Sequence, residues 1–86
     1  MRKPMVAGNW KMNKTVADAV KLINELLPEL QAQTAVDRVV CPPFTALYSV
    51  SELLKNSGIG CGAQDLFWEA KGAFTGEIAP DMIAEL

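Results

Sequence analysis

The residues best suited to chemistry in this chain are Asn9 and Lys11, which follow the short apolar run Met5 to Ala7. Side chains on a β-strand alternate between faces, so both are expected on the same face as Met5 and Ala7. A carboxamide and a primary amine at the carboxyl end of a buried strand are typical of a ligand site in a parallel α/β sheet. A solvated loop lysine beside a turn asparagine has the same spacing, so the pair alone leaves both interpretations open.

The elements that would position this pair are three strands that alternate with three helices. Strands are expected at residues 5–7, 38–41 and 59–63, the second of them apolar on both faces as in a covered parallel sheet. Strands joined by helical crossovers predict an α/β fold with right-handed connections. They do not distinguish an open doubly wound sheet from part of a barrel. Because no linker or low-complexity run interrupts residues 1–86, one unit without an internal boundary is expected.

The first helix is predicted to begin after Thr15, a good N-cap with Asp18 three residues further on. Apolar residues then recur at steps of three and four. They are Val16, Ala19, Val20, Ile23, Leu27 and Leu30. Pro28 lacks an amide hydrogen and is expected to end or kink this helix near Leu27.

The second helix is predicted to be capped by Thr45 and to end in a left-handed turn at Gly58. Leu47, Val50, Leu53 and Leu54 form its apolar side. A third helix is expected to start at Pro80, after Ala79, which is a poor N-cap.

Composition limits the function classes. With 50% hydrophobic residues, 21% charged residues and a net charge of -2, the chain resembles a soluble domain and not a partner of nucleic acid or of an acidic membrane. No apolar run approaches the ~20 residues that span a bilayer. The stretch between Lys3 and Asn9 is too short for the apolar core of a signal peptide. Cys41 and Cys61 have no metal-ligand spacing, so buried free thiols are favoured over a disulfide. We therefore expect a cytoplasmic protein without metal or cofactor.

Four motifs occur in order along the chain. They are GNWKMN at 8–13, CPPF at 41–44, GAQD at 62–65 and GAFTGE at 72–77. Their order and spacing closely resemble the N-terminal part of the triosephosphate isomerase family, from Met1 to Leu86. The resemblance implies the first three βα units of a TIM (β/α)8 barrel. The barrel would be incomplete in this chain, because a full one needs about 250 residues.

The resemblance also implies the site and the reaction. Members of the family interconvert dihydroxyacetone phosphate and glyceraldehyde 3-phosphate by proton transfer through an enediolate, in glycolysis and gluconeogenesis. Lys11 matches the catalytic and substrate-binding lysine, and Asn9 matches the asparagine that contacts substrate. The family's catalytic glutamate and neutral histidine match no residue here, since the chain has no histidine. The chain alone is therefore expected to be inactive.

A long loop at residues 65–76 carries several aromatic residues, more than a solvated loop usually exposes. In the family this loop inserts into the second subunit of a homodimer. Positions that match the dimer interface are Met12, Phe74, Thr75 and Glu77, with Thr75 reaching the partner's copy of Asn9. For Trp68 the alternative is that it packs on its own chain.

Two hypotheses of different classes follow. In the first, the chain is an N-terminal fragment of a glycolytic isomerase, which is favoured because Leu86 lies in what reads as a continuing helix. In the second, it is a non-catalytic α/β piece that binds a full-length subunit through the Thr75 loop. A third and weaker option is another phosphate-handling barrel enzyme.

Overall fold

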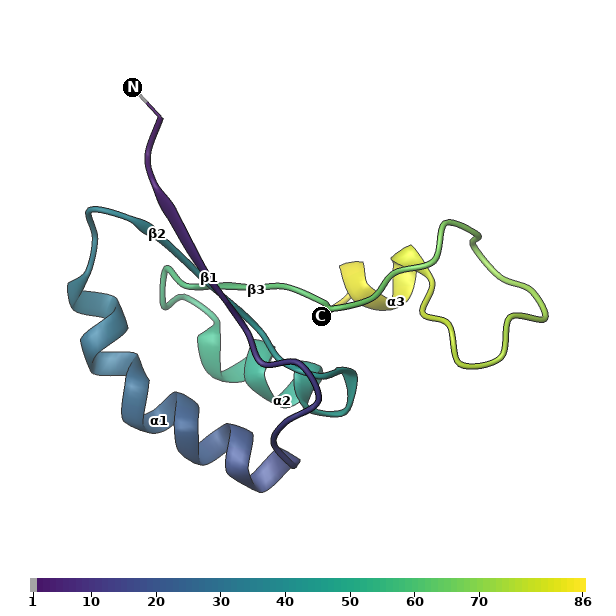
Figure 1. The fold of residues 1–86 in the computed structure, drawn as a ribbon, viewed down its shortest axis with the longest axis horizontal. Helices are drawn as coiled ribbons and strands as arrows, with labels where there is room; N and C mark the ends of the chain where they lie inside the picture. Colours follow the sequence, from purple (N-terminus) through teal and green to yellow (C-terminus); the bar gives the residue numbers. More distant parts are fainter. Residues whose placement is uncertain (1) are drawn as a thin grey trace.

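The computed structural model of the chain describes residues 2–86 and contains three strands alternating with three helices (Figure 1). The elements are β1 (Met5–Asn9), α1 (Val16–Ala32), β2 (Asp37–Cys41), α2 (Phe44–Leu54), β3 (Gly60–Cys61) and α3 (Pro80–Ala84). The strands form one parallel sheet in the order β1-β2-β3. The predicted α/β alternation is therefore confirmed. Met1, where the family resemblance begins, lies outside the described residues.

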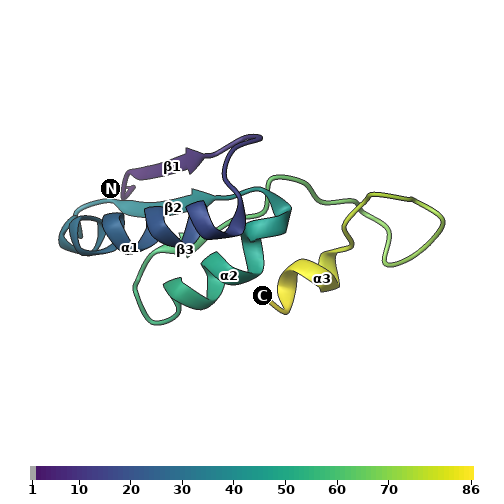
Figure 2. The ribbon, with the colours of Figure 1, turned by 90° about the horizontal axis from the view of Figure 1, so that it is seen from below.

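Helices α1 and α2 lie side by side against one face of the sheet (Figure 2). The core forms between these layers, where the apolar stripe of each helix meets β2 and the residue before β3. Its buried members are Ala19, Ile23, Val40, Ala46, Val50, Leu54 and Ile59. Trp10 packs against this cluster from the end of β1. The residues predicted for the apolar sides of both helices are buried or half-buried, except Val16, which is 42% exposed.

Within residues 2–86, no helix covers the opposite face of the sheet (Figure 2). Met5 on β1 is 63% exposed and Val6 is 61% exposed, and since their side chains point to opposite faces, β1 is exposed on both of its faces. Strands β1 and β3 are the two edges of the sheet, so each has one side without a paired strand. An apolar face and two edges are therefore left uncovered.

Helix α1 begins as predicted but ends later than predicted. The Asp18 amide donates to the Thr15 hydroxyl at 3.3 Å, which makes Thr15 the N-cap. The expectation that Pro28 stops the helix near Leu27 is wrong, because α1 continues to Ala32 with Pro28 inside it. Pro28 and Asn24 are both exposed, so water can hydrate the Asn24 carbonyl that receives no helical hydrogen bond. Packing of Leu27 against the core favours the longer helix.

Helix α2 differs from the prediction at both ends. Pro43 is the N-cap, with φ −61° and without a side-chain cap, and Thr45 lies inside the helix. Pro43 has the extended backbone of an N-cap residue, with ψ 157°, and its ring fixes φ there without a capping hydroxyl. At the other end the helix stops at Leu54, and Gly58 has the predicted left-handed φ of 82° only four residues later. The Ser57 hydroxyl bonds the Leu54 carbonyl at 2.5 Å and closes that end.

The third βα unit, from β3 to α3, has little regular structure. Strand β3 spans two residues instead of the predicted five, although the Gly62 amide still donates to the Val40 carbonyl at 2.9 Å. Glycines and a single neighbouring strand give this segment few contacts that would extend it. Helix α3 begins at Pro80 with Ala79 as an N-cap that makes no side-chain hydrogen bond, as predicted. In the described part of the chain, no helix is long and apolar enough to cross a membrane.

Candidate active-site corner

The carboxyl ends of the parallel strands lie at one edge of the sheet, which is where a site is expected in this fold class. Asn9 ends β1 and pairs with Cys41, which ends β2. Beyond these ends, the Trp10 amide donates to the Cys41 carbonyl at 3.1 Å and continues the ladder by one residue. The predicted pair of Asn9 and Lys11 therefore lies at the expected edge.

Lys11 does not lie on the strand. Strand β1 ends at Asn9, and Lys11 has φ 54°, in the left-handed region. The expectation that both side chains share one strand face is therefore wrong, since alternation stops where the extended backbone stops. A hydrogen bond joins the two residues instead: the Lys11 amide donates to Asn9 Oδ1 at 2.9 Å. This leaves Asn9 Nδ2 as the donor that can face a ligand.

Gln64, which follows β3 closely, connects this corner to the rest of the sheet edge. Its Nε2 donates to the Lys11 carbonyl at 3.1 Å and to the Cys41 carbonyl at 2.8 Å. Sequence reasoning noted the GAQD motif but gave Gln64 no role. Its position just after a strand, at the same edge as Asn9, was the feature that could have identified it.

The ammonium of Lys11 is well placed to meet an anion. Lys11 is exposed. Within residues 2–86, the ion pairs are Lys3 with Asp37 at 3.4 Å and Lys55 with Glu52 at 2.9 Å, and neither involves Lys11. The charge of Lys11 is therefore not neutralised by a carboxylate among these residues.

The long loop between β3 and α3 is held together by aromatic contacts and extends away from the sheet (Figure 1). The Phe67 ring stacks on Trp68 with a centroid distance of 4.1 Å and contacts Phe74 at 4.5 Å. The Phe67 amide donates to the Ile78 carbonyl at 2.8 Å, which closes the base of the loop. The loop is therefore ordered by its own side chains.

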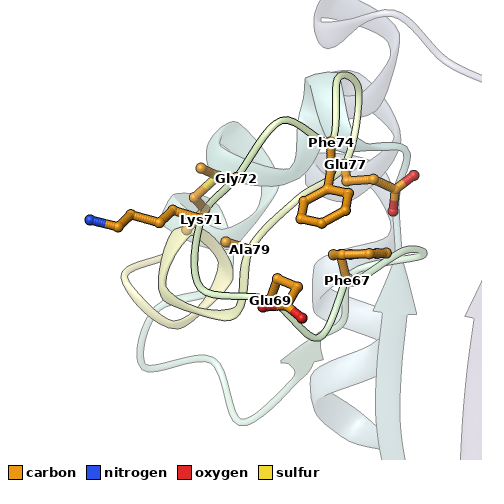
Figure 3. A pocket seen from close by; sticks show the side chains of 8 residues that line it. Phe67, Glu69, Lys71, Gly72, Phe74, Glu77 and Ala79 are labelled. Carbon is orange, nitrogen blue, oxygen red and sulfur yellow. The ribbon is translucent and has the colours of Figure 1, made fainter.

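A hollow of about 150 Å³ lies inside this loop, and neither Asn9 nor Lys11 lines it. Figure 3 shows the rings of Phe67 and Phe74 next to each other at its wall, whereas Lys71 points outward. A small, mainly apolar hollow does not suit a dianionic substrate. We therefore place the candidate site at Asn9 and Lys11.

The four predicted interface residues are all exposed. Met12, in the loop after β1, is 96% exposed, and Phe74 in the long loop is 44% exposed. Trp68 stacks on Phe67 of its own chain, yet 79% of its surface remains exposed. Packing within the chain therefore accounts for only part of the apolar surface of this loop.

The two cysteines are free and half-buried. Burial, with a smaller contribution from nearby Cys41, raises the pKa of Cys61 from 9.0 to about 11. Cys61 is therefore a protonated and weakly reactive thiol near neutral pH. Among residues 2–86, no cluster of three His, Cys, Asp or Glu side chains could bind a metal.

Comparisons with known proteins match nearly the whole chain to a single family. The sequence model of the triosephosphate isomerase family matches residues 4–86. The triosephosphate isomerase of Endomicrobium trichonymphae is 54% identical over 99% of this chain and 34% of its own length. That of Caldanaerobacter subterraneus subsp. tengcongensis is 51% identical over the full chain and 34% of its own.

A solved structure extends the agreement to three dimensions. The crystal structure of triosephosphate isomerase from Bartonella henselae superposes with a TM-score of 0.87 at 27% identity, over 98% of this chain and 34% of that one. The three parallel βα units are thus the first units of a (β/α)8 barrel, and the chain spans about a third of the relatives' length. These matches favour part of the isomerase over a non-catalytic binding piece. The chain belongs to the triosephosphate isomerase family.

Proposed function

We propose that this chain forms the lysine-bearing corner of a triosephosphate isomerase, which interconverts dihydroxyacetone phosphate and glyceraldehyde 3-phosphate. The observation that carries the proposal is the placement of Lys11. Its exposed ammonium lies at the carboxyl edge of the sheet, and its backbone is held by Asn9 and Gln64. In a barrel of this family, that edge is where substrate binds.

In this proposal, Lys11 stabilises the negative charge that develops on the substrate. A triose phosphate is a dianion, and isomerisation through an enediolate adds negative charge at the former carbonyl oxygen. A fixed ammonium beside that oxygen stabilises the transition state more than the bound substrate, which raises kcat. Asn9 Nδ2 supplies a second donor to the substrate, because Asn9 Oδ1 already accepts the Lys11 amide.

The proton transfer itself needs other groups. We propose that the general base and the group that polarises the carbonyl come from the part of the barrel outside this chain. Lys11 and Asn9 alone provide binding and charge stabilisation without a proton acceptor. The 86-residue chain is therefore expected to be inactive by itself.

The active form in this proposal is a homodimer in the cytoplasm. Exposed Met12, Phe74, Thr75 and Glu77 would contact the second subunit, and exposed Trp68 adds apolar area to the same loop. Thr75 would reach the partner's copy of Asn9. The two free thiols support a reducing compartment.

A chimera tests the proposal. Residues 1–86 replace the matching segment of the Endomicrobium trichonymphae isomerase, which is 54% identical. We expect a dimer that interconverts the two triose phosphates. Lys11→Ala should lower kcat/KM by at least about 150- to 900-fold, the equivalent of ~3–4 kcal/mol of transition-state stabilisation.

The matched control is Lys21→Ala, which removes an exposed lysine from α1. It should change kcat/KM less than about twofold, as expected for a surface charge. A folded, dimeric Lys11→Ala chimera with the kcat/KM of its parent would contradict the assignment of Lys11. A folded, dimeric parent chimera without isomerase activity would contradict the proposed function itself.

A further inference from the structure

We infer that Asn13 is a positioning residue that holds Lys11 and Met12 in one turn, so that a single hydrogen bond serves both the substrate site and the subunit contact. The inference rests on the proposed function, since the substrate and the second subunit both belong to it. Its starting point is the bond of 2.7 Å that Asn13 Nδ2 donates to the main-chain carbonyl of Trp10. This bond closes a ring that contains Lys11 and Met12.

The peptide unit between Trp10 and Lys11 is held at both of its polar groups. Its carbonyl accepts from Asn13 Nδ2, and its amide hydrogen, which belongs to Lys11, is donated to Asn9 Oδ1 at 2.9 Å. Because a peptide unit is planar, the two carboxamides together fix its rotation. That rotation sets φ of Lys11, which is 54°. Asn13 therefore acts on the backbone from which the lysine side chain extends.

The turn is attached to the rest of the chain at both ends. Before it, Trp10 packs against the core and its amide continues the sheet ladder. After it, Thr15 caps α1. Between these points Lys11 and Lys14, with φ 54° and 83°, adopt the left-handed backbone that residues other than glycine rarely adopt. Such a segment persists only when its surroundings over-determine it, and the bond from Asn13 is a cross-link within it.

Met12 lies inside the same ring. Its side chain is 96% exposed, so its direction depends on the backbone of the turn more than on packing within the chain. In the proposed dimer the second subunit covers Met12 and removes water from the neighbouring bond between Asn13 and Trp10. A hydrogen bond is stronger in such a water-poor environment. The placement of Met12 and that of Lys11 therefore depend on the same contact.

The experiment uses the chimera described above with Asn13→Leu, which keeps a branched side chain and removes the donor. At a concentration where the dimer is fully formed, we expect kcat/KM to fall by about 3- to 10-fold. The Kd of the dimer should rise by about the same factor, which is the shift that one hydrogen bond gives to an equilibrium. The matched control is Asn24→Leu on the exposed surface of α1, which should leave both quantities within about twofold of the parent.

A conservative variant tests the hydrogen bond itself. In Asn13→His the imidazole Nδ1 occupies the position of the asparagine Nδ2 and can carry a hydrogen. We expect kcat/KM and Kd within about twofold of the parent. A histidine variant as impaired as Asn13→Leu would overturn the role of the bond. A loss in Asn13→Leu confined to kcat/KM or to Kd would overturn the shared turn, and so would no change in either.

Double-mutant cycles separate positioning from general stability. In the Lys11→Ala background, Asn13→Leu should reduce the residual kcat/KM by less than about twofold, because the ammonium that it positions is absent. In the Met12→Ala background, Asn13→Leu should raise Kd by less than about twofold. Losses that simply multiply in either background would show that Asn13 acts on the fold as a whole and would overturn the inference.

A crystal structure of the Asn13→Leu chimera gives a test that does not depend on turnover. We expect residues 11–13 to leave the conformation that they have in the parent chimera, whereas an identical turn would overturn the inference even if the parent were inactive. Failure of the proposed function is recognised separately, by a folded and dimeric parent without activity. If Asn13→Leu does not fold, Asn13→Ala carries the same measurements.

Discussion

The guanidinium of Arg38, at the start of β2, donates a 2.6 Å hydrogen bond to the main-chain carbonyl of Leu30 near the end of α1. The same side chain bonds the Val36 carbonyl at 3.1 Å and the Gly58 carbonyl at 3.4 Å. One half-buried cation thus joins the last turn of α1 to the turn after α2. A positive charge is also favourable at the carboxyl end of a helix.

Replacing Arg38 should destabilise the fold at this end of the sheet. We expect Arg38→Met to lower the free energy of unfolding by about 1–3 kcal/mol, since it leaves carbonyls that were bonded to a charged donor. Urea unfolding of the chimera measures this. Arg38→Lys keeps the charge but cannot bond three separate carbonyls, so an intermediate loss is expected. An unchanged unfolding midpoint for Arg38→Met would contradict a stabilising role.

A charge placed in the long loop should weaken dimerisation. Phe74→Asp or Thr75→Arg would bury an unpaired charge in the proposed subunit contact, so we expect weakly associating subunits with low kcat. Sedimentation equilibrium and turnover on the same samples of the chimera measure both effects. Ala70→Asp adds the same charge as Phe74→Asp elsewhere in this exposed loop and serves as its control. A stable monomer with full kcat would show that the loop serves association alone.

The raised pKa of Cys61 predicts a pH dependence. With a pKa of about 11 in the folded chain, against 9.0 ordinarily, the thiolate fraction near pH 8 falls ~100-fold. Alkylation of Cys61 by iodoacetamide, followed by peptide mass spectrometry on the chimera, should be slower in the folded protein than in urea. Equal rates in the two conditions would contradict the shift.

The same shift affects stability in a defined direction. The unfolded thiol ionises first as pH rises, so the stabilisation linked to protonated Cys61 is complete below pH 9.0 and is lost as pH approaches about 11. The unfolding midpoint of the chimera should therefore fall over this range. In Cys61→Ser the fall should be smaller, and an identical fall would assign the effect to other groups.

The isolated 86-residue chain should be marginally stable. Within residues 2–86, its sheet has two unpaired edges and one face without helices, and a chain of this size buries little surface even in a complete domain. We expect a broad thermal transition and aggregation at micromolar concentration, whereas the chimera unfolds cooperatively. A sharp transition from a soluble monomer would count against this expectation.

Features set by neighbouring residues could be predicted from the sequence. The hydroxyl of Thr15, the missing cap at Ala79 and the apolar stripes of α1 and α2 depend on local pattern. The structure agrees with each except at Val16, which is exposed. Pro28 was misjudged because the packing of α1 against the core outweighs one missing helical hydrogen bond. Thr45 was misjudged because Pro43 already fixes the backbone that precedes the helix.

The identity of the site residues could be predicted from the sequence, but their geometry could not. Motif spacing identified Asn9 and Lys11, yet the left-handed backbone of Lys11 depends on hydrogen bonds whose partners include Gln64, 53 residues further on. Strand alternation treats each residue as part of a regular element and cannot anticipate such a contact. For the same reason, the predicted five-residue third strand was too long: its extent depends on its neighbours in the sheet.

The uncovered edge of β1 has a consequence for biosynthesis. In a family member of full length, these strands leave the ribosome before the strands that would close the barrel. About two thirds of such a protein, roughly 165 residues, then remains to be made, which takes roughly 8–33 s at ~5–20 residues per second. During that interval the free backbone groups of β1 are open to nascent-chain chaperones and to neighbouring copies on the same polysome. In such a full-length relative, translation speed as well as final stability would therefore set how much of the protein reaches a closed barrel.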